Sequence, residues 1–317
     1  MHTETHEITT EGGVVITLRE QSADDPTAAV VFVHGATYGG RSIFDPVGAP
    51  EYSWLVWAAN AGLAAFAVDV RGYGDSKRPP EMDASNHSGE PPVRAIEATE
   101  DVLAAIRKVR ERFSCPVHLV GTSWGSMISG ALLAGSKAPD LASVTLHAPV
   151  FEPAGDLVDG LVDSVSEPFR TVGRTEARSR WNEQVPSDPP ARIRGGTEAS
   201  DPVFEAFWES LVSSGQGIPD EDAIVAPNGT LKDLSEASRG NHVYDPAEID
   251  VPTLVIRGSL DPTATREDAL RIYDRLDVPD DESAYVEIEG GTHFVHLERR
   301  RTALYEAVDA FRAGVED

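Results

Sequence analysis

Short, continuous apolar runs alternate with helix-like segments along most of this sequence, and this alternation limits the folds open to the chain. The runs that we predict to be strands cover residues 14–18, 28–33, 64–70, 117–120, 141–150, 253–256 and 284–288. Helices are predicted between them at 54–61, 96–113, 124–134 and 266–276, and a closing helix should carry Leu297, Leu304, Val308 and Phe311. Apolar runs without polar alternation are typical of strands buried on both faces. The predicted fold class is therefore α/β, a mostly parallel sheet flanked by helices.

The alternation stops after residue 150 and resumes at Pro252. Residues 151–246 are rich in Pro, Gly, Asp and Arg, with short aromatic stretches such as 204–208. We predict that residues 1–150 and 247–317 form the core, and that residues 151–246 form a separate cap or lid inserted into it.

A Gly-x-Ser-x-Gly motif at residues 121–125 lies between a predicted strand and a predicted helix. In that context the motif places its serine on a tight, strained turn with the hydroxyl exposed. Gly121 and Gly125 lack side chains that would collide where the strand and helix cross. Isolated matches to this motif arise by chance, so the assignment of a nucleophile also depends on finding residues that could activate the serine. Ser123 is the candidate nucleophile.

A serine hydroxyl is a weak nucleophile, so it needs a base within about 2.6–3.2 Å and a third group that orients the base. His293 follows the last predicted strand in the Gly-rich loop 290–294. Parallel-sheet proteins place functional side chains in such loops. Among the other histidines, His147 and His242 are the strongest alternative candidates for the base, but neither directly follows a strand in a Gly-rich loop. We therefore predict His293 as the general base.

Asp261 is the candidate for the orienting acid. It lies just past the predicted strand 253–256 and 32 residues before His293, and the order Ser, Asp, His fits this type of motif. Asp69 also closes a predicted strand, but it precedes the serine. A salt bridge or a cap on the Arg71-Gly72 turn is the structural interpretation of Asp69.

An oxyanion that forms during acyl transfer needs two backbone donors. The N–H after the nucleophile, that of Trp124, is one candidate, and the N–H of Ala36, in the loop after an early strand, is the other. The His34-Gly35 pair fits a turn that lets the backbone approach a substrate. His34 itself is interpreted as structural.

Taken together, these motifs resemble the α/β-hydrolase family. The resemblance rests on His34-Gly35, the run from Asp69 to Ser76, the 121–125 motif, Asp261 and Gly291-Thr292-His293. It covers nearly the whole chain outside residues 151–246. It implies that Ser123, Asp261 and His293 are catalytic, that Ala36 and Trp124 donate to the oxyanion, and that the insertion is a helical cap.

The resemblance also narrows the reaction. Serine stands where dehalogenases and epoxide hydrolases of this family use aspartate, which argues against both. The Ser123-Trp124-Gly125 run looks like the elbow of proline iminopeptidases, but their His-Gly-Gly-Pro-Gly turn is replaced here by residues 34–38. Hydrolysis of a small-molecule carboxylic ester or lactone through an acyl-enzyme is the first hypothesis, and it requires no metal and no organic cofactor.

Two other functions stay open. An aminopeptidase would need an acidic anchor for the substrate ammonium, and Glu183, Glu205 or Glu209 could serve. A non-catalytic small-molecule receptor of the same fold is the third hypothesis.

Aromatic side chains in the insertion have two interpretations. They could line an acyl pocket, because ligand pockets are mostly apolar, or they could form the insertion's own core. The residues concerned are Trp181, Phe204, Phe207 and Trp208.

The charge balance is strongly acidic. There are 53 Asp and Glu against 27 Lys and Arg, a formal charge of −26, and only four of the basic residues are lysines. Such a charge argues against nucleic acid or an anionic membrane as a partner. The first twelve residues lack the features of a signal peptide, so we expect a cytoplasmic protein. Scarce lysine beside abundant acid resembles proteins of salt-loving organisms, although a GC-rich genome also replaces lysine by arginine.

Overall fold

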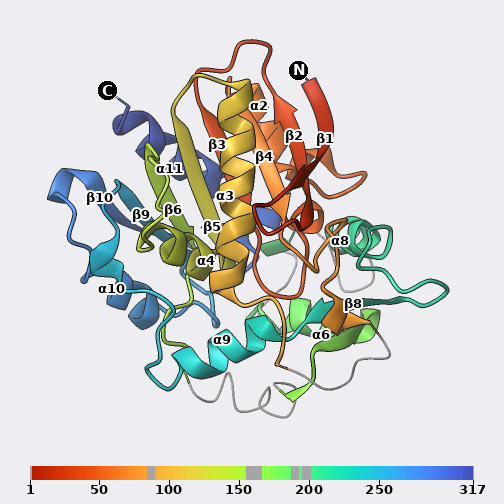
Figure 1. Ribbon diagram of the computed structural model, residues 1–317. Coiled ribbons are helices and arrows are strands. Elements are labelled where there is room, and N and C mark those ends of the chain that lie inside the picture. Colours follow the sequence, from red (N-terminus) through yellow and green to blue (C-terminus); the bar gives the residue numbers. More distant parts are fainter. Residues whose placement is uncertain (1, 84–89, 155–165, 187–192, 195–200, 317) are drawn as a thin grey trace.

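A single large sheet organises the computed structural model, which describes residues 2–83, 90–154, 166–186, 193–194 and 201–316 (Figure 1). The strands of this sheet are β1 (His2–Thr9), β2 (Val15–Ser22), β3 (Ala29–Val33), β4 (Ala64–Asp69), β5 (Val117–Thr122), β6 (Ser143–His147), β9 (Thr253–Gly258) and β10 (Ser283–Ile288). Their spatial order is β1-β2-β4-β3-β5-β6-β9-β10. From β4 to β10 all neighbours are parallel, while β1 and β2 form an antiparallel edge. The mostly parallel sheet predicted from the sequence is confirmed.

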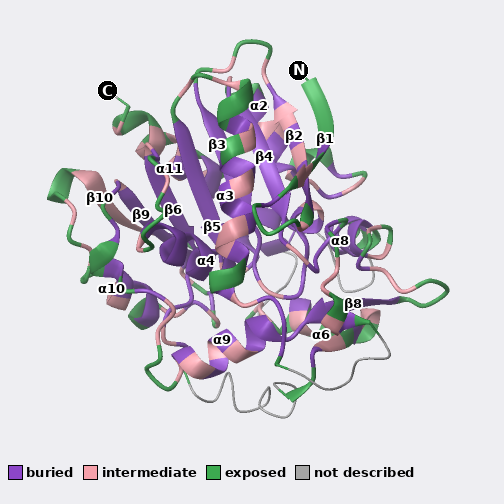
Figure 2. Cartoon of the chain, viewed as in Figure 1, coloured by how far each residue is buried: buried purple, intermediate pink, exposed green. Residues whose placement is uncertain are grey.

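Helices cover both faces of this sheet, as expected for buried parallel strands. Helices α3 (Ala95–Arg112), α4 (Trp124–Leu133) and α10 (Arg266–Tyr273) pack on one face, and α2 (Trp54–Asn60) and α11 (Arg301–Gly314) pack on the other. Side chains of β3 alternate between the two apolar clusters, with Val31 in the first and Phe32 in the second. The central strands are accordingly buried along their length (Figure 2). No helix in the described part of the chain is long and apolar enough to span a bilayer.

The other described elements outside the inserted segment are short. They are α1 (Gly40–Phe44) and the 3₁₀ turns Pro50–Tyr52, Pro80–Met82, Pro246–Glu248, Asp280–Glu282 and Val295–Leu297. The last turn corrects one prediction, because Leu297 lies in it rather than in the closing helix, which begins at Arg301.

Strand β1 is an element that the apolar pattern did not predict. Of its side chains only that of His6 is buried, yet the strand pairs with β2 along its full length, from His2 opposite Ser22 to Thr9 opposite Val15. An edge strand needs only one partner for its backbone hydrogen bonds, so it forms without an apolar pattern of its own.

The inserted segment contributes helices α6 (Arg174–Glu183), α8 (Pro202–Val212) and α9 (Gly229–Ala237). It also contains a small antiparallel pair, β7 (Phe169–Gly173) and β8 (Ala223–Pro227), so it is not purely helical. In Figure 1, α6, α9 and β8 lie below the large sheet, and α8 lies to its right. The aromatic side chains of α6 and α8 belong to the same apolar cluster as α2 and α11, so the segment shares a core with the sheet. The boundaries predicted for the cap remain a prediction.

We expect the acidic composition to make stability depend on salt. A formal charge of −26 repels itself in the compact state, and the Debye length falls from about 10 Å at 0.1 M salt to about 3 Å at 1 M. The melting temperature should therefore rise as KCl is raised from 0.1 to 3 M. A parallel series in sucrose, which stabilises without screening charge, is the control. A flat or falling melting temperature in KCl would contradict the salt-loving interpretation.

Candidate active site

Ser123 lies on the tight turn between β5 and α4. Its φ is 55° and its ψ −121°, a backbone conformation that residues other than glycine rarely adopt. A Cβ atom on Gly121 would overlap the carbonyl oxygen of Gly125, and one on Gly125 would overlap that of Val33. The backbone N–H of Ser123 donates to the carbonyl of His147 at 2.9 Å. The two glycines of the motif are thus sterically required, and neighbouring β6 holds the strained turn.

The three residues predicted to act together do meet. His293 Nε2 lies 3.0 Å from Ser123 Oγ, and His293 Nδ1 lies 2.9 Å from Asp261 Oδ2. The other Asp261 oxygen, Oδ1, accepts the backbone N–H groups of Thr263 at 2.8 Å and Ala264 at 2.9 Å. The buried carboxylate therefore accepts the Nδ1–H of His293, which leaves the Nε2 lone pair facing the serine hydroxyl.

Asp69, the rival acid, has a structural role. Its Oδ1 accepts the N–H of Gly40 at 2.7 Å and its Oδ2 accepts the N–H of Asp75 at 3.2 Å. Its Oδ2 also lies 3.7 Å from Arg19 Nη2, whereas Arg71 pairs with Asp101. Asp69 thus fixes the turn that follows β4 and the start of α1.

The two predicted oxyanion donors lie next to the nucleophile. Ala36 and Ser123 line the same cavity, and a Cβ on Gly35 would lie only 3.0 Å from Ser123 Cβ. Trp124 is the first residue of α4, so the helix supplies no acceptor for its N–H. The indole Nε1 of Trp124 donates to Asp233 of α9 at 2.9 Å, which ties this residue to the inserted segment.

His34 is built into the loop that carries Ala36. The N–H of Val70 donates to His34 Nε2 at 3.2 Å, so Nδ1 carries the proton and donates to the carbonyl of Gly35 at 2.8 Å. Burial lowers the pKa of His34 to about 4, which keeps the ring neutral. The Gly35 carbonyl and the Ala36 N–H belong to one peptide unit, so His34 orients the predicted donor.

A cavity of about 300 Å³ opens beside Ser123 and His293, at the small end of the range for ligand pockets. Its apolar lining consists of Ala36, Ile43, Val150, Leu231, Leu234 and Phe294. Its polar lining includes Thr37, Tyr38, Arg180, Glu183, Gln184, Thr263 and His296. Helices α6 and α9 of the inserted segment therefore supply part of its wall. Of these lining residues, the sequence indicated only Ala36 and Glu183 as candidates for substrate contact, although Thr37 and Phe294 directly adjoin the predicted site residues Ala36 and His293.

The four cap aromatics do not line this cavity, which corrects their assignment as pocket residues. They are fully buried in the cluster shared with the sheet. The Trp181 ring lies 5.4 Å from that of Phe207 and 5.0 Å from that of Phe294, and its Nε1 donates to Asp201 at 2.8 Å. Trp208 and Phe204 stack with parallel rings. The structure supports the alternative interpretation, that these rings form a core.

We expect Trp181→Ala to lower stability rather than to change acyl preference. Removing a buried tryptophan costs about 3–5 kcal/mol of unfolding free energy. Losses on p-nitrophenyl acetate and octanoate should therefore be equal and follow the melting temperature. Ile43→Ala, which enlarges the cavity itself, is the matched variant and should shift the acetate-to-octanoate ratio. A shifted ratio in Trp181→Ala at normal stability would restore Trp181 to the pocket.

Among the proposed ammonium anchors, only Glu183 lines the cavity. Glu205 pairs with Arg174 and Arg178 of α6, outside the cavity lining. Glu209 does not line the cavity either. Arg180, one turn before Glu183, brings a positive charge to the same wall.

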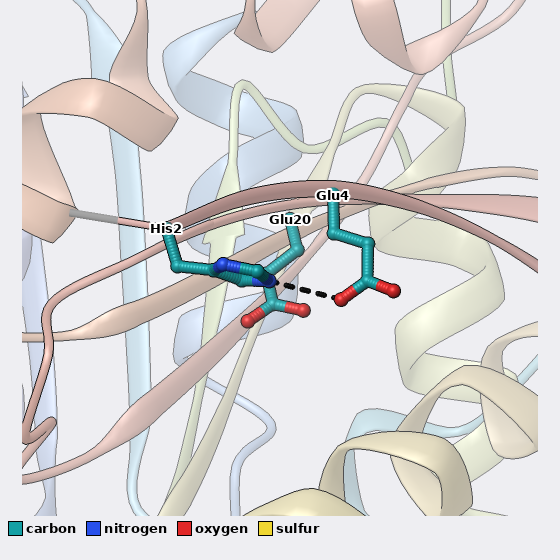
Figure 3. A group of neighbouring side chains, drawn as sticks. All are labelled: His2, Glu4 and Glu20. Carbon is teal, nitrogen blue, oxygen red and sulfur yellow. Dashed lines mark hydrogen bonds and ion pairs between the residues drawn. The ribbon is translucent and has the colours of Figure 1, made fainter.

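Among the described residues, one group has atoms close enough to share a metal ion: His2, Glu4 and Glu20 at the β1–β2 edge (Figure 3). Glu20 already accepts from His6 Nε2 at 2.7 Å and pairs with Arg112 at 3.0 Å. Arg112 also lies 3.4 Å from Glu4. These contacts show an ion-pair cluster around Arg112, and its residues lie outside the cavity lining.

Comparison with known proteins identifies the family to which this fold belongs. The model of the alpha/beta hydrolase family matches residues 30–307, whereas none of the curated proteins matches the sequence significantly. Similar solved structures include an esterase from Exiguobacterium antarcticum, with a TM-score of 0.66 and 18% identity over 97% of this chain and 98% of that one. A bromoperoxidase from Bacillus anthracis has a TM-score of 0.64 and 17% identity, over 97% of this chain and 99% of that one. At such identities the likeness shows the fold alone, but the family match spans most of the sequence. The chain belongs to the α/β hydrolase family.

Proposed function

We propose that this protein is a serine hydrolase that cleaves a small carboxylic ester or lactone through an acyl-enzyme. The observation that carries the proposal is the hydrogen-bonded chain from Ser123 Oγ through His293 to Asp261, with distances of 3.0 and 2.9 Å, at the wall of a cavity that offers both apolar and polar contacts. A nucleophile, a base and an orienting acid at these distances form the arrangement that acyl transfer requires.

The steps follow from this geometry. Ser123 Oγ attacks the ester carbonyl carbon while its proton passes to His293 Nε2, and Asp261 stabilises the imidazolium that forms. The N–H groups of Ala36 and Trp124 donate to the new oxyanion. Collapse of the tetrahedral intermediate breaks the ester bond, and the departing alcohol takes the proton from His293. Water then attacks the acyl-enzyme by the same route, and Ser123 is regenerated as the acid leaves.

The cavity favours a small substrate. Its volume of about 300 Å³ leaves room for a short acyl chain, and Ile43, Leu231 and Phe294 offer it apolar contacts. A lactone places its acyl and alcohol parts in one compact ring, so it suits the same space.

An aminopeptidase remains the second candidate because Glu183 lines the cavity and could bind a substrate ammonium. The neighbouring Arg180 opposes that role, since it would repel the same ammonium. For this reason ester or lactone hydrolysis ranks first. The receptor hypothesis predicts ligand binding with no turnover.

The test is a substrate panel with the wild-type protein. It comprises p-nitrophenyl esters from acetate to dodecanoate, five- and six-membered lactones, and alanyl and prolyl p-nitroanilides. We expect hydrolysis of short esters or lactones and little of the anilides. Preference for the anilides, with a loss specific to Glu183→Gln, would favour the peptidase. Absence of turnover on every substrate would overturn the proposal.

A further inference from the structure

Gln216, between α8 and β8, has a fully buried side chain whose hydrogen bonds all reach backbone groups. Its Nε2 donates to the carbonyls of Thr37 and Val225, each at 3.0 Å. Its Oε1 accepts the N–H of Gly39 at 2.9 Å and that of Gly74 at 3.0 Å. One amide from the inserted segment thus joins three backbone segments that are far apart in the sequence.

Two of these contacts fall on the loop that carries Ala36. Thr37 has a φ of 75°, in the left-handed region that disfavours a residue with a side chain. Such a conformation persists only when the surroundings hold it. A Cβ on Gly39 would lie 2.8 Å from Gln216 Oε1, so the glycine lets this loop close onto the amide.

A second side chain of the inserted segment supports the same loop. Arg170 of β7 donates to the Thr37 hydroxyl at 2.5 Å and to the carbonyl of Pro227 at 2.9 Å. The loop is therefore held from two directions. His34 fixes the peptide before Ala36 through the Gly35 carbonyl, and the inserted segment fixes Thr37 after it.

We propose that Gln216 is a positioning residue for the oxyanion hole: it holds Thr37 and Gly39 so that the N–H of Ala36 points at the oxygen bound above Ser123. The inference rests on the proposed function, because it requires a tetrahedral adduct on Ser123. It also gives the inserted segment a part in catalysis, since Gln216, which positions the loop of Ala36, lies within residues 151–246.

The expected effect is on the transition state and not on substrate binding. Loss of an oxyanion donor costs about 10²–10³-fold in kcat, and a displaced donor should cost less, about 10–100-fold. A bound ground-state ester does not depend on this donor to the same degree, so KM should stay within about twofold.

Two substitutions separate positioning from folding. Gln216→Met keeps the length of the side chain but removes all four hydrogen bonds. Gln216→Glu keeps the acceptor for Gly39 and Gly74 but, when ionised, places an oxygen against the Thr37 and Val225 carbonyls. Protonation restores one donor, so the activity of this variant relative to wild type should rise as the pH falls from 9 to 6. Gln21→Met, on β2, is the matched control, because Gln21 lies outside the cavity lining.

The measurements are kcat and KM on an ester, the inhibition constant of a trifluoromethyl ketone, and the rate of Ser123 labelling by a fluorophosphonate, all per folded molecule. We expect kcat, ketone affinity and labelling rate to fall together in Gln216→Met and to stay unchanged in Gln21→Met. Unchanged labelling and ketone affinity in folded Gln216→Met, or in Gln216→Glu at pH 9 if the first variant does not fold, would overturn the inference.

These readouts also distinguish the two proposals. If the wild type is labelled but hydrolyses no ester, the proposed substrate class fails, while slower labelling of Gln216→Met still supports the positioning role. If the wild type is not labelled at all, both proposals fail.

Discussion

Ser123→Ala should abolish ester hydrolysis and leave the fold intact. The change removes the single oxygen that lies 3.0 Å from His293 Nε2, and alanine fits the same turn. Removal of the serine from such a triad lowers kcat by about 10⁴–10⁶-fold. Water would then have to attack the ester directly, without the positioned serine oxygen. Turnover of p-nitrophenyl acetate, read against the uncatalysed rate, measures the loss, and circular dichroism and the melting temperature report the fold.

Ser213→Ala is the matched control, since the hydroxyl of this exposed serine donates to the carbonyl of Glu209 in the preceding helix turn. Its activity should equal that of wild type. Hydrolysis by Ser123→Ala within a few fold of wild type would rule out Ser123 as the nucleophile, and another group would then have to perform the chemistry.

Asp261→Asn should cost about 10³–10⁴-fold in kcat with little change in stability. The N–H groups of Thr263 and Ala264 require an acceptor at the Oδ1 position, so the amide oxygen must lie there. The amide NH₂ then faces His293 Nδ1 and forces that atom to act as an acceptor. The proton moves to Nε2, where it blocks activation of Ser123. The measurement is kcat on the same ester, with the melting temperature alongside.

Asp69→Asn is the comparison that tests the choice of acid. Both Asp69 oxygens accept backbone N–H groups, so an amide must turn its NH₂ toward one of them. Leaving a buried donor unsatisfied costs about 1–3 kcal/mol, and we expect a lower melting temperature with kcat nearly unchanged. If the two variants exchange these outcomes, Asp69 is the orienting acid and the assignment of Asp261 is wrong.

Local sequence was a good guide wherever burial and backbone sterics act on neighbouring residues. The apolar run that became β3 predicted a strand covered on both faces, because each of its side chains must avoid water. The glycines at 121 and 125 predicted the tight turn, because no side chain fits there. The polar strand β1 gave no such signal, since its stability comes from pairing with β2 and not from burial.

The sequence by itself determined the class of fold and the strained turn at Ser123. It also showed that His293 and Asp261 each follow a predicted strand of the same sheet. Only the tertiary structure decided which side chains surround the cavity. Trp181 and Trp208 are apolar aromatic residues of the kind that line ligand pockets, but their rings fill the core shared with the sheet. The role of Gln216 has no local pattern, because its four partners come from segments up to 179 residues away. Contacts of that kind depend on how helices and loops pack across the sheet, and that packing cannot be predicted from a single stretch of sequence.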